Sequence, residues 1–349
     1  MNEQSGDSKN KEEKEEFPSQ LRYDISSGEW VVVASGRAKR PEMFQKEKRS
    51  KEESADKDCP FCDFNTIKNA LTVFENGQKV EEVTENWSAV SIPNKFPAFL
   101  PSDDLNKRYE NSLYLTMNAV GYHEVVITRD HHKSMGELPV DKVREVFALY
   151  KERYLELKQK KHVNYVSIFH NHGAEAGASI THPHSQIITT PLIDVDLNKA
   201  LSKVKNYHRE KKDCIYCQMN EWEMKRKERV VYENDLFLVV CPFASKAAFQ
   251  AIVSPKKHLA YFEEITDEEL DQLADAFSKI LSKLYKGLND PPYNFYLHCA
   301  PHDGMNHDYY HWHWTILPKT DVWAGFELGA RMEISTIKPE KAAEYLREQ

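Results

Sequence analysis

The chain contains Cys59-Pro60-Phe61-Cys62 and, further along, Cys214-Ile215-Tyr216-Cys217, and each stretch opens a series of landmarks that occurs twice. After each cysteine pair come short apolar runs, a histidine, a helical stretch, a further apolar run and a His-x-His motif. The two motifs are His182-Pro183-His184 and His311-Trp312-His313. Because the order of landmarks is the same in both series, we predict a tandem duplication of one unit.

The secondary structure expected within each unit is also the same. Apolar runs of strand length flank a stretch whose apolar residues recur at helical period. In the first copy this stripe runs from Val140 to Leu157. In the second, Thr266-Asp267-Glu268-Glu269 has the spacing of a capping box, and the stripe continues to Leu284. We therefore predict an α+β fold, a mainly antiparallel sheet with one long packed helix per unit.

Composition and charge narrow the class of protein. With 349 residues, 40% hydrophobic and 29% charged, the chain has the composition of a globular protein large enough for two domains. A net charge of −8 disfavours a nucleic-acid partner, which needs a basic surface. No apolar run reaches the roughly 18–20 residues of a membrane span, and the polar N-terminus is unlike a signal peptide. We expect a cytoplasmic protein with no membrane partner.

The domain prediction follows the repeat. Residues 1–16 contain almost nothing apolar, so burial cannot offset their ordering entropy, and we predict a disordered tail. Residues 17–200 form the predicted N-terminal, catalytic half. Residues 201–349 form the predicted C-terminal half, which we interpret as structural because no glycine- and alanine-rich loop precedes His313.

The paired cysteines indicate metal sites. Zinc prefers four tetrahedral sulfur and nitrogen ligands, and two cysteines two residues apart can bind one ion. A redox dithiol is the alternative for a single such pair, but the duplication favours two zinc ions. The repeat register selects His131 over its neighbours His123 and His132, and Cys241 and Cys299 are expected to be buried packing residues. The predicted ligands are Cys59, Cys62, His131 and His182 for one zinc, and Cys214, Cys217, His258 and His311 for the other.

The first His-x-His motif predicts a nucleophile. Residues two apart on a strand face the same side, so His182 can bind zinc while His184 meets a substrate. The small residues of the preceding stretch, 173–179, let backbone amides approach a ligand closely, which suits a phosphate cradle as well as an ordinary loop.

The run Phe169-x-Asn171-x-Gly173-x-x-x-Gly177-x-x-x-x-His182-Pro183-His184-x-Gln186 resembles the signature of galactose-1-phosphate uridylyltransferases, a branch of the histidine-triad superfamily. The resemblance extends from Arg22 to about Ala343 and implies a histidine-triad-like unit built twice, in a homodimer. It also includes three shorter segments: Arg37-Ala38-Lys39-Arg40-Pro41, a nucleotide-binding turn Asn94-x-Phe96-Pro97-Ala98, and a sugar-binding segment Gly325-Phe326-Glu327.

This resemblance implies UDP-glucose:galactose-1-phosphate uridylyl transfer by a ping-pong mechanism. His184 would attack the α-phosphorus of the nucleotide sugar and hold the uridylyl group until a second sugar 1-phosphate collects it. A glutamine at position 186, where hydrolytic relatives have histidine, favours transfer over hydrolysis. Gln186, Ser179 and Asn171 would donate hydrogen bonds to phosphate oxygens. By the same resemblance, the remaining substrate-binding residues would be Arg37, Arg40, Asn94, Gly325, Phe326 and Glu327.

Some positions depart from the family pattern. His170 and His172 flank Asn171 where the family has glutamate and a basic residue, and Lys95 and Asp321 also differ. The second Cys-x-x-Cys with His258 and His311 is more similar to ADP-glucose phosphorylases, so adenylyl transfer is the alternative. A third reading is a non-catalytic zinc module that binds RNA through exposed Trp312, Trp314 and Trp323.

Overall fold

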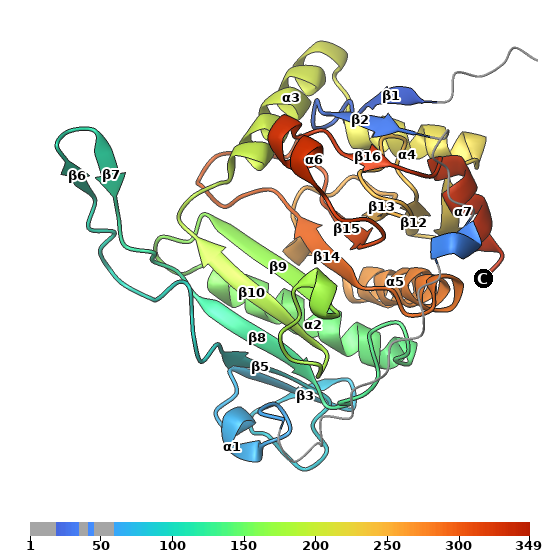
Figure 1. Cartoon of the computed structure of the whole chain (residues 1–349). Helices are drawn as coiled ribbons and strands as arrows, with labels where there is room; N and C mark the ends of the chain where they lie inside the picture. Colours follow the sequence, from blue (N-terminus) through green and yellow to red (C-terminus); the bar gives the residue numbers. More distant parts are fainter. Residues whose placement is uncertain (1–18, 35–40, 45–58) are drawn as a thin grey trace, which may run out of the picture.

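The computed structural model describes residues 19–34, 41–44 and 59–349. The predicted tail at residues 1–16 and the predicted phosphate-binding Arg37 and Arg40 lie outside these ranges. Within them, one antiparallel sheet of eleven strands runs through the molecule in the order β11-β12-β13-β15-β14-β9-β10-β8-β5-β3-β4 (Figure 1).

The two ends of this sheet come from the two halves of the chain. The first half supplies β3 (Thr72–Glu75), β4 (Gln78–Val80), β5 (Ala89–Pro93), β8 (His123–Thr128), β9 (Tyr165–His172) and β10 (His184–Thr190). The second half supplies β11 (Val230–Glu233), β12 (Phe237–Val240), β13 (Ala251–Pro255), β14 (Tyr293–His298) and β15 (His313–Pro318). The halves join where β9 pairs with β14, with Asn171 opposite Asn294.

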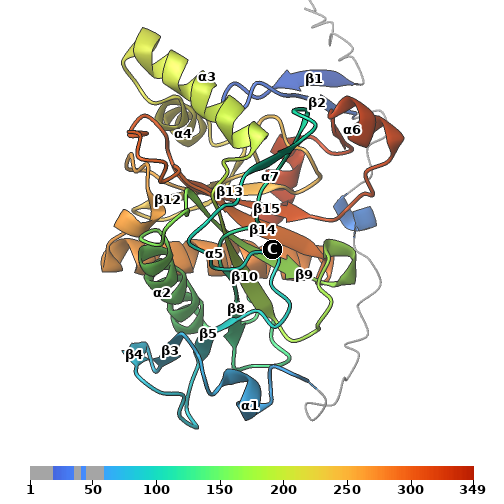
Figure 2. The same cartoon turned by 90° about the vertical axis from the view of Figure 1, so that its left-hand side faces the viewer.

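The order of elements confirms the α+β tandem duplication. In the first half, helix α2 (Val140–Leu157) lies between β8 and β9, and in the second half α5 (Asp267–Leu288) lies between β13 and β14. Both helices lie on the same side of the sheet (Figures 1 and 2). The predicted capping box begins α5, because Thr266 Oγ1 accepts from the Glu269 amide and Glu269 accepts from the Thr266 amide.

The main core fills the layer between the sheet and these two helices. Phe147 of α2 and Phe277 of α5 both contact the Trp314 ring edge-on, with centroids 5.3 and 5.6 Å apart. Burial of such aromatic side chains supplies several kcal/mol each, on the order of 25 cal/mol per Å² of apolar surface. Trp312 and Trp314 are 0% exposed. The expectation that Trp312 and Trp314 are exposed was wrong, because both face the helix layer. Trp323 is exposed as expected, but a single ring leaves the RNA-binding reading without a surface of several stacking rings.

Smaller elements cover the opposite face of the sheet in the second half. They are α3 (Val195–Lys211), α4 (Ile215–Arg226) and a small sheet of β1 (Gln20–Tyr23), β2 (Trp30–Val33) and β16 (Ile334–Ser335). The boundary predicted after residue 200 falls inside α3, and the division into halves at that point stays a prediction. The remaining helices are α1 (Phe64–Ile67), α6 (Gly325–Ala330) and α7 (Pro339–Arg347), with short 3-10 turns at Pro41–Phe44, Ala174–Ala176 and Phe262–Glu264.

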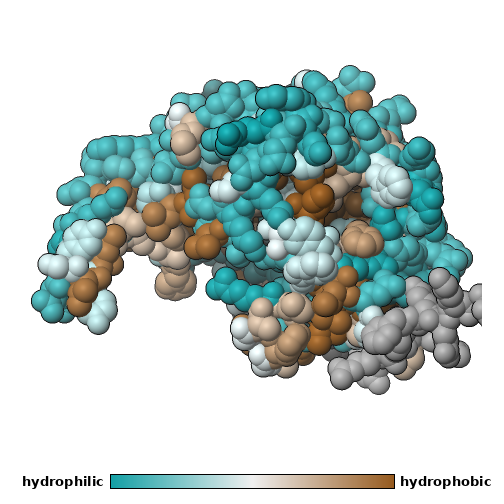
Figure 3. Space-filling view, turned by 90° about the horizontal axis from the view of Figure 1, so that it is seen from above, coloured by the Kyte–Doolittle hydropathy of each residue, from teal (hydrophilic) through white to brown (hydrophobic). Residues whose placement is uncertain are grey.

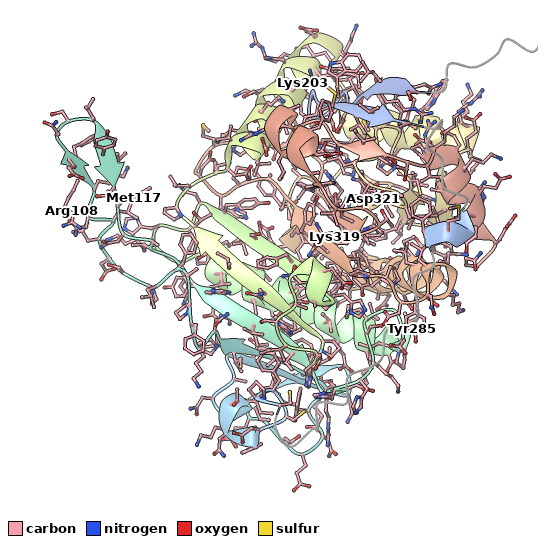
Figure 4. All side chains as sticks on the ribbon, viewed as in Figure 1. Arg108, Met117, Lys203, Tyr285, Lys319 and Asp321 are labelled. Atoms are coloured by element: carbon pink, nitrogen blue, oxygen red, sulfur yellow. The ribbon has the colours of Figure 1, made fainter. Side chains whose placement is uncertain are left out.

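A hairpin of β6 (Arg108–Glu110) and β7 (Tyr114–Thr116) projects away from the body (Figures 1 and 4). Its large apolar side chains Tyr109, Leu113 and Tyr114 are exposed, and Figure 3 shows apolar surface along the projecting arm. Among the described helices none is long and apolar enough to cross a membrane.

Candidate active site and metal clusters

The alternation of β10 places His184 on the face of the sheet opposite to α2. Ser185 faces the helix, where it accepts a hydrogen bond from the Tyr150 hydroxyl at 2.5 Å. His184 and Gln186 therefore lie together on the other face, which we call the open face. His182, predicted to share the strand, instead precedes it in a bend, because β10 begins at His184.

The backbone fixes the tautomer of His184. Its Nδ1 lies 2.8 Å from the carbonyl oxygen of His182, so Nδ1 carries the proton and donates it. The lone pair is then on Nε2, which has no hydrogen-bond partner in the part of the chain that the structure describes. Burial lowers the pKa of His184, although the bond to the carbonyl opposes this shift. The imidazole is therefore neutral and nucleophilic near neutral pH.

A histidine that begins β8 orients Gln186. The Ala98 amide donates to Nδ1 of His123 at 3.1 Å, so the proton of a neutral His123 ring is on Nε2. This nitrogen lies 2.7 Å from Oε1 of Gln186 and donates to it. The amide nitrogen of Gln186 is then free to donate to a substrate on the open face.

The predicted nucleotide turn adjoins this pair. Asn94 directly follows β5, and its Oδ1 accepts from the Phe96 amide at 2.8 Å. Its Nδ2 lies 3.1 Å from Nε2 of His123, and because both nitrogens carry protons in this tautomer, the contact is a close approach and not a hydrogen bond. The structure thus brings Asn94, His123 and Gln186 into one cluster, although they come from three separate strands or strand ends.

Asn171 lies on β9 with its side chain on the same open face. Asn294 of the second half donates through Nδ2 to Oδ1 of Asn171 and to the carbonyl of Ala176, both at 2.8 Å. Gly173 and Gly177 have φ of 87° and 90°, which glycine adopts without strain. Asn294 therefore fixes both Asn171 and the small-residue loop, and Ser179, which is exposed, follows in that loop.

The two histidines beside Asn171 lie on the opposite face of β9, which meets the helix layer. His170 stacks on Phe295 with ring centroids 4.8 Å apart, and its Nδ1 lies 2.9 Å from the Ser185 hydroxyl. His172 lies 2.7 Å from Asp290 through Nε2. Both departures from the family loop thus face the helix layer, and they leave the open face unchanged.

The first predicted metal cluster assembles from Cys59, Cys62, His131 and His182, with all four ligand atoms within 4.8 Å of one another. Nδ1 of His182 lies 3.5 Å from each cysteine sulfur, and Nδ1 of His131 lies 3.2 Å from that of Cys62. A tetrahedral zinc ion separates sulfur and nitrogen ligands by about 3.5 Å, so the donors fit.

Hydrogen bonds and ring contacts with residues outside the cluster orient these ligands. Nε2 of His182 donates to the Thr128 carbonyl at 2.7 Å, which leaves Nδ1 for a metal. Burial lowers the pKa of His182 to about 4, so its ring is neutral at neutral pH. The Phe61 ring, between the two cysteines, contacts the rings of both His182 and His184 at 5.8 and 5.1 Å. The Phe61 ring therefore packs between the first metal cluster and the candidate nucleophile His184.

The second cluster repeats this arrangement with Cys214, Cys217, His258 and His311. Nδ1 of His258 and of His311 each lie 3.5 Å from the Cys217 sulfur, and their Nε2 atoms donate to the carbonyls of Asp308 and Pro255. The structure thus brings the eight residues predicted as ligands together in two four-residue clusters. That the metal is zinc stays a prediction.

The predicted sugar segment is not brought to His184 within one chain. Gly325, Phe326 and Glu327 lie on α6, which both views place over the second half, apart from β10 (Figures 1 and 2). Glu327 accepts from the Ala324 amide at 3.0 Å and so caps its own helix. The departure at Asp321 lies in the same region, where its carboxylate accepts from Thr336 at 3.3 Å (Figure 4).

Sequence reasoning missed the roles of His123 and Asn294. His123 was considered only as a metal ligand, although its place at the start of a predicted strand was a usable signal. Asn294 gave no local signal, because its contact with Asn171 depends on pairing between strands that are 123 residues apart in sequence.

Comparisons with known proteins match both halves of the chain. Residues 9–194 match the family model for the galactose-1-phosphate uridyl transferase N-terminal domain, and residues 200–348 match that for the C-terminal domain. The chain is 30% identical to ADP-glucose phosphorylase from Arabidopsis thaliana over 94% of this chain and 92% of the relative. It is 27% identical to galactose-1-phosphate uridylyltransferase from Thermotoga maritima over 94% and 98%.

A solved structure shares the whole fold. The crystal structure of the Arabidopsis thaliana ADP-glucose phosphorylase with bound ADP-glucose superposes with a TM-score of 0.78 at 30% identity, covering 95% of this chain and 99% of that one.

Proposed function

The chain belongs to the galactose-1-phosphate uridyl transferase family, and from that premise we propose that it transfers a nucleoside monophosphate from a nucleotide sugar to an acceptor phosphate through His184. The observation that carries the proposal is the bond from Nδ1 of His184 to the His182 carbonyl at 2.8 Å. It holds the ring so that the lone pair of Nε2 faces the open face beside Gln186.

In the first step Nε2 of His184 forms a bond to the α-phosphorus of the nucleotide sugar. The bond from that phosphorus to the bridging oxygen breaks, and sugar 1-phosphate leaves with the electron pair. In the second step a phosphate oxygen of the acceptor attacks the same phosphorus and releases His184. Each step trades one phosphorus bond for another, so no oxidant, reductant or free water is required.

Donors on the open face stabilise the charge that moves onto the phosphate oxygens. We assign this role to the Gln186 amide nitrogen, oriented by His123, and to Asn171, oriented by Asn294. Ser179 and Asn94 are proposed substrate contacts. Arg37 and Arg40, which lie outside the described residues, are proposed contacts to the nucleotide and phosphates.

The two Cys/His clusters would hold zinc as closed four-ligand sites. A bound zinc would supply structural rigidity, because four protein ligands leave no open position for substrate. His182 would connect the first cluster to catalysis by fixing the carbonyl that orients His184.

For the donor and acceptor we propose UDP-glucose and galactose 1-phosphate. Pro183 within the His-x-His motif is typical of uridylyltransferases, and several relatives named galactose-1-phosphate uridylyltransferase match most of the chain. Adenylyl transfer from ADP-glucose is the second candidate. It is favoured by the complete second metal cluster and by the 30% identity to an ADP-glucose phosphorylase.

The sugar segment supports a homodimer in this proposal. If Gly325, Phe326 and Glu327 contact the sugar, they must reach His184 from a second copy, because α6 lies apart from β10 in the same chain. Sedimentation analysis of the purified protein tests this part directly, and a strictly monomeric, active enzyme would contradict it.

The test of the function is covalent labelling. The protein is incubated with α-³²P UDP-glucose or, separately, α-³²P ADP-glucose, and we expect acid-labile, base-stable label on His184. The His184→Ala variant should lose the label, while His208→Ala, which changes an exposed histidine of α3, should keep it. The donor that labels identifies the base, and no label from either donor would refute the proposal.

A further inference from the structure

A cavity of about 830 Å³ lies in the second half of the molecule. Its floor is the open face of β13, β14 and β15, and its roof is α3, α4 and the β1–β2 hairpin. Lys203 joins α3 to the β1–β2 hairpin, because its ammonium lies 4.8 Å above the Tyr23 ring (Figure 4). The cavity is separate from the candidate active site, since its lining includes none of His184, Gln186 and Asn171.

The floor of the cavity is the duplicate of the candidate active site. In the second half His298 pairs with His313 across β14 and β15. In the first half Ser185 pairs with His170, and one further step of that register sets Asn171 opposite His184. His313, His298 and Thr315 therefore occupy the places of His184, Asn171 and Gln186, and all three line the cavity.

The polar groups of this floor have unused hydrogen-bonding capacity. Nδ1 of His313 donates to the His311 carbonyl at 3.2 Å, as in His184, which leaves Nε2 as an acceptor. His298 stacks on His313 with ring centroids 4.7 Å apart. Among the described residues, no hydrogen-bond partner contacts the His298 ring, Nε2 of His313 or the Thr315 hydroxyl, although Thr315 is only 3% exposed. All three residues line the cavity, so a ligand in it can hydrogen-bond to these groups.

The charges of the cavity disfavour a phosphate. Six carboxylates line it against four lysine or arginine side chains. The basic groups nearest the floor are already ion-paired, Lys246 with Glu29 at 2.7 Å and Arg229 with Glu223 at 2.8 Å. In the described part of the chain Lys199 is the one lining cation that forms no ion pair, so a dianion would enter a net acidic space with a single free cation.

The rest of the lining suits a flat, uncharged ring. It includes the aromatic side chains of Tyr216, Phe243 and Tyr296. Such rings stack on a heteroaromatic base, while hydroxyl and imidazole groups hydrogen-bond to its edge and to a ribose. The volume is within the usual range for a small-molecule site.

We propose that this cavity is a second ligand site that binds an uncharged nucleoside. It does not perform phosphoryl transfer, because Thr315 offers no amide donor in place of Gln186 and no glycine loop precedes His313. The proposal rests on the duplication and on the cavity itself, and it goes beyond the function proposed for His184.

The test is equilibrium dialysis of the full-length protein against tritiated uridine or adenosine. We expect Thr315→Val and His298→Phe each to weaken binding by about 10-fold or more. The matched control Thr116→Val, on the exposed β7 strand, should bind as wild type does. The rate of His184 labelling should stay within about twofold of the wild-type rate in all three variants. A failure of the nucleoside site would therefore leave the function proposed for His184 unaffected, and the reverse also holds.

Three outcomes would overturn the site. They are no nucleoside binding at millimolar concentration, binding unchanged in both cavity variants, or binding in the cavity that is tighter for UMP or AMP than for the nucleoside. If both variants fail to fold, crystals of the wild-type protein grown with uridine or adenosine decide the matter, because the proposal requires the nucleoside to lie against His298 and Thr315.

Discussion

Nε2 of His123 lies 2.7 Å from Oε1 of Gln186, and the Ala98 amide that donates to Nδ1 of the same ring fixes the direction of the bond. The side chain of Gln186 is thus held with its amide nitrogen toward the open face. His123 acts on the reaction through Gln186, which makes it a positioning residue.

The first prediction concerns this pair. Gln186→Ala should slow single-turnover labelling of His184 by about 10²–10³-fold, the usual cost of one donor to a developing anion. His123→Phe should slow the same step less, by about 10-fold, because Gln186 remains but is free to rotate. A rapid-quench time course at saturating donor measures both rates. Equal losses in rate for the two variants, or a change in donor affinity alone, would contradict the positioning role.

The second prediction concerns the junction of the halves. Asn294→Leu should lower the free energy of unfolding by about 1–3 kcal/mol, since it leaves two acceptors without their donor. It should also slow labelling, because Asn171 and the 173–178 loop lose their anchor. Urea unfolding and the labelling assay check the two effects. Unchanged labelling in the folded variant would show that the second half does not support the site.

The third prediction concerns the metal clusters. Purified protein should contain two zinc ions per chain, Cys214→Ser should contain one, and Cys62→Ser should contain one. Because zinc binding is coupled to folding, chelation should lower the melting temperature of the wild type more than that of either variant. Elemental analysis with calorimetry measures this, and a wild-type content of one zinc would remove the second site.

The fourth prediction concerns a buried ion pair beneath the sheet. Arg153 of α2 binds Glu124 of β8 through two hydrogen bonds of 2.6 and 2.7 Å, and both side chains are buried. Glu124→Gln should destabilise the protein by about 1–3 kcal/mol, because the buried guanidinium loses its buried counter-charge and keeps only the half-exposed Glu156. Chemical unfolding of the variant measures the loss. The exposed pair of Lys79 and Glu152 is the control, and Glu152→Gln should cost about 1 kcal/mol or less.

The fifth prediction concerns pH. Burial raises the pKa of Glu340, but hydrogen bonds from Arg22 and Arg229 outweigh it, and the net pKa is lowered. A carboxylate with a lowered folded pKa stabilises the fold fully above its unfolded pKa of about 4.3 and loses that contribution as pH falls through the folded value. Unfolding free energies of wild type and Glu340→Gln should therefore converge in acid and separate above about pH 5. A constant difference across this range would argue against the linkage.

The internal repeat of Cys-x-x-Cys and His-x-His predicted the α+β duplication, both four-residue clusters and the long helices. Such motifs are visible in sequence because metal ligation and helix amphipathicity constrain residue type at fixed spacing. Strand alternation, which is a local property, predicted that His182 and His184 share a face, but His182 precedes the strand, and the residue that shares the face of His184 on β10 is Gln186. The sequence could not show that Trp312 and Trp314 are buried, because which side of a strand meets the helices depends on the whole sheet.

The sequence by itself thus determined the repeated unit, and it identified the candidate metal ligands and the candidate nucleophile. Only the tertiary structure decided which residues of one half contact and support the other half. The pairing of β9 with β14 brings Asn294 to Asn171, and the roof of α3, α4 and the β1–β2 hairpin turns the duplicate of the active site into a partly open cavity. The physical reason is that these contacts join residues far apart in sequence, so no local pattern of residues encodes them.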